Sequence, residues 1–69
     1  MDKTSASLII NSTVSLSSSL DELLGHIGSV SDIEERDRLR KAVGEVMKVL
    51  TLEIIFPIVK EHPELDPDK

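Results

Sequence analysis

The stretch from Val46 to Val59, 46-VMKVLTLEIIFPIV-59, is strongly apolar although the whole chain carries a net charge of -5. Ten of its fourteen residues are apolar, and only Lys48 and Glu53 are charged. A helix turns by about 100° per residue, so the apolar side chains divide into two stripes on different sides of the helix. One stripe can pack within the chain, and the other needs a further partner.

The two stripes predict two different surfaces. The first should form one half of a core inside the chain, and it consists of Leu39, Val43, Val46, Leu50 and Ile54. The second should form an interface between chains, and we expect this interface to consist of Val49, Leu52, Ile55, Phe56 and Val59. Because the stripes lie far apart around the helix, one neighbouring helix can cover only one of them.

A capping motif marks the start of the helix that carries both stripes. In Ser31-Asp32-Ile33-Glu34, the serine hydroxyl can accept a hydrogen bond from the Glu34 amide, and the Glu34 carboxylate can accept one from the Ser31 amide. Pro57 has no backbone N–H, which predicts a kink or a stop there. The helix is therefore expected over about residues 32–56. Three ion pairs are expected on its surface, Asp32–Arg36, Glu34–Arg38 and Asp37–Lys41.

An earlier segment has the spacing of a helix that packs against another helix. Its core positions follow one another at steps of four and three residues, and they are Ile9, Thr13, Leu16, Leu20, Leu23, Ile27 and Val30. The pattern predicts a helix over about residues 4–27, capped by Thr4 or Ser5 and ended by Gly28 in the left-handed conformation. We expect its inner face to consist of Ile9, Leu16, Leu20, Leu23 and Ile27.

These patterns favour an all-α fold. A strand is the alternative for the first segment, because Leu8, Ile10, Val14 and Leu16 alternate, but the rest of the chain offers a poor partner strand. Two helices of similar length, joined by a turn at residues 28–31, predict an antiparallel hairpin over residues 1–62. Residues 63–69 form an acidic tail with two prolines, which we expect to be extended or mobile.

The size of the chain predicts association. A protein of 69 residues buries only about 60% of the surface of its unfolded chain, and one core of this size rarely contributes more than about 3–5 kcal/mol. The chain has no cysteine, so disulfides cannot add stability. We expect two hairpins to dock through the second stripe as a homodimeric four-helix bundle. A marginally stable monomer, a tetramer and a complex with another protein are the alternatives.

The sequence contains no motif that predicts a catalytic, metal or cofactor site. His62 lies among acidic residues of the tail, but metal ligands must be held in fixed positions. His26 is near the end of the first helix, where a histidine is a favourable partner of the helix dipole. The serines of the first helix have no histidine close in sequence to act as a base. We therefore expect no enzyme, metal or cofactor.

The composition disfavours nucleic acids and membranes as partners. The negative charge repels phosphates, and the single aromatic residue, Phe56, leaves little for base stacking. No window approaches the roughly 20 apolar residues that span a bilayer, and no export signal is recognisable, so we expect a cytoplasmic protein.

The function expected from these features is non-catalytic helix–helix association, in an adaptor, chaperone or regulatory role, with the protein itself as the main partner. The alternative is a nucleic-acid-binding regulator that uses basic residues in the first half of the second helix, Arg36, Arg38, Arg40 and Lys41. Acidic neighbours interleave with these bases and argue against that alternative.

Overall fold

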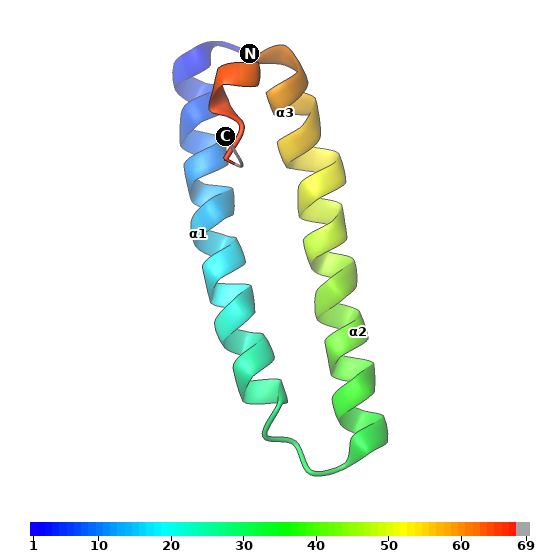
Figure 1. Ribbon diagram of the computed structural model, residues 1–69. Coiled ribbons are helices and arrows are strands. Elements are labelled where there is room, and N and C mark those ends of the chain that lie inside the picture. Colours follow the sequence, from blue (N-terminus) through cyan, green and yellow to red (C-terminus); the bar gives the residue numbers. More distant parts are fainter. Residues whose placement is uncertain (68–69) are drawn as a thin grey trace.

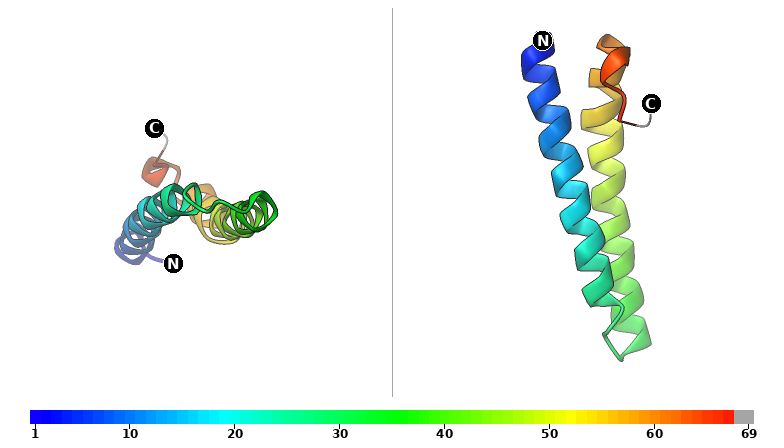
Figure 2. Two further views of the ribbon diagram at one scale, coloured as in Figure 1. Left: turned by 90° about the horizontal axis from the view of Figure 1, so that it is seen from below. Right: turned by 60° about the vertical axis from the view of Figure 1, so that its left-hand side comes forward.

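The computed structural model describes residues 1–67 and is helical over most of this range (Figure 1). Helix α1, Lys3–Ile27, runs antiparallel to a second helical rod. This rod consists of α2, Ile33–Val49, the π-helical segment η1, Leu50–Ile55, and α3, Phe56–Glu61. The two rods lie side by side over their length (Figure 2) and give a body of 46 × 18 × 16 Å. The expected all-α fold with two long helices is confirmed.

The core between the rods is thin. Its buried apolar residues are Ala6, Ile10, Ile27, Val43 and Ile58. Thr13 is also buried, and its hydroxyl donates a hydrogen bond of 2.8 Å to the Ile9 carbonyl, so the polar group has a partner. No large side chain among residues 1–67 is completely removed from solvent. The hairpin alone therefore has little apolar burial to stabilise it.

Helix α1 is rotated relative to the expected packing. The inner stripe is Ala6, Ile10, Thr13, Ser17, Leu20, Leu24 and Ile27. The expected stripe shares Thr13, Leu20 and Ile27 with it, but Ile9, Leu16 and Leu23 are exposed. Both stripes have steps of three and four residues, and their centres differ by about 60° around the helix. The observed stripe places the small residues Ala6 and Ser17 between the rods and leaves Ile9, Leu16 and Leu23 outside.

The second rod follows the expected core more closely. Val43 is buried, and Leu39, Leu50 and Ile54 are half-buried. Val46 is the exception, because it is exposed while the neighbouring Met47 is half-buried. Of the five residues expected in the core of this rod, only Val46 is exposed.

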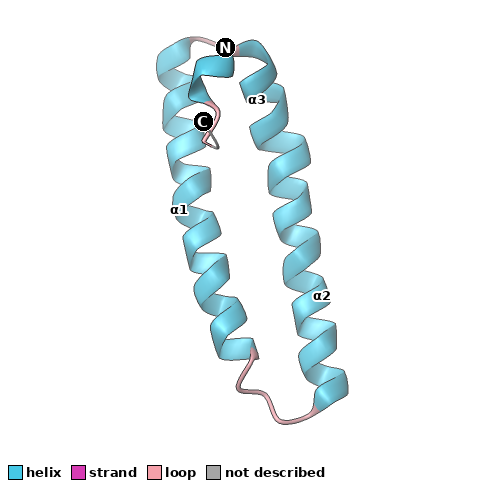
Figure 3. Ribbon diagram, viewed as in Figure 1, coloured by secondary structure: helices cyan, strands magenta, loops and turns pink. Residues whose placement is uncertain are grey.

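Pro57 does not stop the helix, and the ribbon continues through it to Glu61 (Figure 3). In an α-helix the proline ring would clash with the carbonyl of Glu53. Here the Phe56 amide donates to the Thr51 carbonyl, five residues earlier, so the turn before the proline is wider. Pro57 then lies in the first turn of α3, where its missing N–H costs little.

The wider turn also changes which side chains face α1. Leu50 and Ile58 are eight residues apart and would lie about 80° apart on a regular α-helix. One extra residue in the π-helical turn reduces this difference to about 20°. As a result, Ile58 joins Ala6 and Ile10 in the core.

The ends of the helices differ from the sequence expectation by one or two residues. Asp32, not Ser31, caps α2, and its carboxylate accepts from the amides of Glu34 at 3.0 Å and Glu35 at 3.5 Å. Helix α1 begins at Lys3 after Asp2, ahead of Thr4 and Ser5. Gly28 ends α1 with φ -58°, so the expected left-handed conformation is wrong.

The expected surface ion pairs are not formed. Within the described residues, Asp32–Arg36, Glu34–Arg38 and Asp37–Lys41 all lie beyond ion-pair distance. Pairing two exposed side chains gains about 0.2–1 kcal/mol and costs side-chain entropy, so such pairs are readily lost. The charged surface of α2 contributes little to holding the hairpin together.

The C-terminal segment folds back over the N-terminal end of α1 (Figure 1), so of the expected extended or mobile tail, residues 63–67 are not extended. Pro63–Leu65 forms a 3₁₀ turn, η2, and Leu65 packs against the core residues Ala6, Ile10 and Ile58. Glu64 lies 3.7 Å from the Lys3 ammonium, and the pKa of its carboxyl is lowered by its own backbone amide and by Lys3. Residues 68–69 of the expected tail lie outside the described residues.

The cap assignment predicts that Asp32→Ala destabilises the protein and that Ser31→Ala does not. Loss of the hydrogen bonds to the Glu34 and Glu35 amides should lower the free energy of unfolding by about 1 kcal/mol. Urea denaturation of the two variants and the natural chain, at one protein concentration, measures the difference. Equal destabilisation by both substitutions would contradict the assignment.

Gly44→Ala should stabilise α2 by up to about 1 kcal/mol, because alanine is the better helix former. A Cβ atom at Gly44 would meet no atom within 4 Å. Gly28→Ala is the control, since a Cβ there would lie 3.3 Å from the Gly25 carbonyl oxygen. Thermal unfolding followed by circular dichroism measures both effects. Destabilisation by Gly44→Ala would mean that another chain approaches this position.

Candidate protein-interaction surface

More large apolar side chains lie on the surface of the hairpin than in its core. Five apolar residues are buried, whereas eleven large ones are exposed. The exposed set is Met1, Leu8, Ile9, Val14, Leu16, Leu23, Ile33, Val46, Val49, Leu52 and Phe56. Single exposed apolar residues are normal, but contiguous groups of them mark interaction surfaces. Whether these exposed residues mark an interaction surface therefore depends on whether they lie next to one another.

One group forms a continuous apolar face across both rods, which we call the Leu50 face. A depression of about 280 Å³ is lined by Leu8, Ile9, Ser12, Thr13, Leu16, Leu50 and Ile54. A second depression of about 280 Å³ is lined by Glu45, Val46, Val49 and Leu50. Leu50 belongs to both, so the two depressions adjoin. We define the Leu50 face as Leu8, Ile9, Leu16, Val46, Val49, Leu50 and Ile54.

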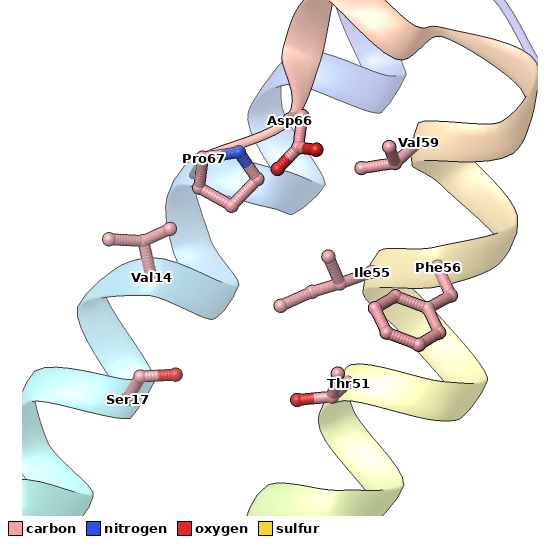
Figure 4. A pocket seen from close by; sticks show the side chains of 8 residues that line it. All are labelled: Val14, Ser17, Thr51, Ile55, Phe56, Val59, Asp66 and Pro67. Carbon is pink, nitrogen blue, oxygen red and sulfur yellow. The ribbon is translucent and has the colours of Figure 1, made fainter. Parts of the chain in front are cut away.

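A second group lies on the opposite side of the hairpin, and we call it the Phe56 face. It surrounds a depression of about 420 Å³ that is lined by Val14, Ser17, Thr51, Ile55, Phe56, Val59, Asp66 and Pro67 (Figure 4). Val14 and Leu16 are two residues apart on α1, so their side chains point in nearly opposite directions. Ile55 points towards α1, and Asp66 and Pro67 of the C-terminal segment lie over one end of the depression.

The five residues expected to form one interface are divided between these faces. Val49 lies on the Leu50 face, whereas Ile55, Phe56 and Val59 line the depression of the Phe56 face. Ile55 and Val59 are half-buried and pack against the core of their own chain. Leu52 is exposed and lines neither depression.

The cause of this division is the π-helical segment η1. Val49 precedes it and Phe56 follows it, so the extra residue per turn rotates Phe56 by about 100° relative to Val49. A stripe that is continuous on a regular α-helix is therefore broken at Leu50–Ile55. Pro57 was the signal in the sequence, but it predicts a distortion without specifying a wider turn.

Sequence reasoning missed the contribution of α1 to the surface. Ile9 and Leu16 were assigned to the core, and Leu8 to no role, yet all three lie on the Leu50 face. The available signal was the presence of two overlapping stripes on α1, only one of which can face α2. Ser5, Ser12 and Ser19 alternate with Ile9, Leu16 and Leu23 along the outer stripe.

The basic residues of α2 do not form one surface. Arg36 is half-buried, and its Nε atom is buried without a hydrogen-bond partner. The side chain of Arg40 reaches the C-terminal end of α1. Its Nη2 atom would lie 3.9 Å from the Cβ atom if Gly28 were replaced by alanine. Arg38 and Lys41 are exposed, and Arg38 lies about 160° around the helix from Arg36. The cations are thus divided between the inner and the outer side of α2.

His26 and His62, the two histidines weighed as candidate site residues, lie at opposite ends of α1. His26 is exposed in the last turn of α1. His62 lies 3.0 Å from the Met1 carbonyl oxygen and 3.6 and 3.7 Å from the carboxylates of Glu61 and Glu64. Over the described range, no three potential metal ligands come together. None of the helices in this range is long and apolar enough to span a membrane.

No protein-family model matches this chain. No curated protein and no solved structure matches it either. The function of the two apolar faces is therefore inferred from their own residues.

Proposed function

We propose that this protein is a non-catalytic helical hairpin that acts through helix–helix association, in an adaptor, chaperone or regulatory role. The observation that carries the proposal is the excess of exposed over buried large apolar side chains. These side chains are about half exposed, so covering one Leu, Val or Phe contributes roughly half of the ~1.5–3 kcal/mol of complete burial. A few such contacts would equal the whole contribution of a core of this size, about 3–5 kcal/mol.

The shape of the molecule supports helices as partners. The exposed apolar residues lie along two rods that run side by side, and the Leu50 face extends over both of them. Helical partners pack into such surfaces through side chains spaced by three and four residues. A homodimeric four-helix bundle is the simplest assembly of this kind, because two-fold symmetry lets one surface cover its own copy.

Self-association predicts a mass and a stability that depend on protein concentration. Light scattering should give a multiple of the 7.6 kDa chain mass. The melting temperature should rise with concentration, because association binds only the folded form. A poorly helical monomer would show that a different protein covers the surface. A fully helical monomer, with the same melting temperature at all concentrations, would overturn the proposal.

Added salt should strengthen self-association. Each chain carries a net charge of -5, so two copies repel one another, and salt screens this repulsion. Binding to nucleic acid has the opposite dependence, because salt weakens contacts between basic residues and phosphates. Sedimentation equilibrium in low and high sodium chloride measures the first effect. Fluorescence anisotropy with labelled RNA and DNA, in the same buffers, measures the second. Tight, salt-sensitive binding that is lost with Arg38→Ala would favour the alternative function.

A further inference from the structure

We propose that the Leu50 face is the self-association surface and that the Leu50 face of a second copy of the chain covers it. The inference rests on the proposed function and goes further, because it names the partner and the side of the hairpin that binds it. Three properties of the molecule support this assignment: its exposed area, the location of its exposed apolar residues and its shape.

The exposed area of the chain is larger than that of a typical monomer of its mass. A folded monomer of 7.6 kDa exposes about 4,300 Å² by the usual scaling of surface with mass. This chain exposes 5000 Å². The excess of roughly 700 Å² is close to the ~800 Å² that each partner buries in a stable protein interface. A partner that covers one whole face of the hairpin would bring the exposed area down to that of a typical monomer.

The Leu50 face is the side that the chain leaves uncovered. It is built from both rods and runs from Leu8, near the open end of the hairpin, to Val46 on α2. Glu45 is the single charged residue that lines its two depressions. The Phe56 face differs in part, because Asp66 and Pro67 of the same chain lie over one end of its depression, although Val14 and Phe56 stay exposed (Figure 4). Desolvation of the Leu50 face therefore costs few polar groups.

The width of the Leu50 face fits a second hairpin. A single helix can fill the groove between the rods, at Leu16 and Leu50, but it leaves Val46 and Val49 exposed on the flank of α2. A second copy presents a face of the same width and length, and each copy covers the other in a two-fold arrangement. The outer stripe of α1 alternates large and small residues, with Leu16 between Ser12 and Ser19. Such alternation lets the large side chains of one copy fit between those of the other.

Paired substitutions on the two faces test this inference. Leu16 and Val14 are on the same helix, 46% and 43% exposed, and on opposite faces. Val49 and Phe56 are a second matched pair on the other rod, 54% and 56% exposed. A carboxylate at Leu16 or Val49 would be buried twice in a two-fold dimer, once in each copy. We expect Leu16→Asp and Val49→Asp to raise the dimer dissociation constant about 100-fold or more. We expect Val14→Asp and Phe56→Asp to change it by less than about 3-fold.

Sedimentation equilibrium measures these dissociation constants, and circular dichroism checks that each variant keeps its helices. If Leu16→Asp fails to fold, cross-linking provides the second measurement. The chain has no cysteine, so Leu16→Cys and Val14→Cys each introduce a single thiol. A bis-maleimide should cross-link the Leu16→Cys protein into dimers at least about 10-fold faster than the Val14→Cys protein, because only the former thiols lie on the surface that the two copies share.

The outcomes separate this inference from the proposed function. A natural chain that dimerises but is dissociated by Val14→Asp or Phe56→Asp, and not by Leu16→Asp or Val49→Asp, overturns the assignment of the face and leaves association intact. A dimer that resists all four substitutions does the same. A natural chain that stays monomeric and fully helical at every concentration removes the proposed function itself.

Discussion

The ring of Pro57 is the constraint on which the arrangement of the second rod depends. A regular α-helix through Pro57 would place its ring against the Glu53 carbonyl, and the wider turn of Leu50–Ile55 avoids this clash. The same turn brings Ile58 round to Ala6 and Ile10, where Leu65 completes the core. It also separates the apolar residues before the proline from those after it. The ring of one proline thus sets both the core at this end and the division of the surface.

The long helices were predictable because their signals are local and repeated. Steps of three and four residues define a helix whichever neighbour it meets, and α1 was expected to within one residue of its bounds, Lys3–Ile27. The rotation of α1 was not predictable in the same way. Two stripes share Thr13, Leu20 and Ile27, and the choice between them depends on the facing helix. The N-cap of α2 was ambiguous for a similar reason, since the side chains of both Ser31 and Asp32 can cap a helix.

The sequence predicted that an uncovered apolar surface exists, but not which residues form it. The apolar excess at Val46–Val59 correctly indicated residues that one helix cannot cover. A single helix considered alone, however, cannot show that Leu8 and Leu16 of α1 lie on the same side as Val49 and Leu50. It also cannot show that a wider turn places Phe56 elsewhere. Surfaces that span two elements become visible only when the relative rotation of those elements is known.

The π-helical segment has a consequence for how such a chain could change by mutation. A π-helical turn is equivalent to an α-helix with one residue inserted, so this stretch carries one residue more than a regular helix of the same length needs. Loss of one codon within residues 50–55 would restore regular α-helical spacing, with a kink where the proline ring meets the preceding turn, and would rotate everything after it. Phe56 and Val59 would then move relative to Val49 without any change in chemical composition. A short deletion, more readily than a series of substitutions, could give a hairpin of this type a different binding face.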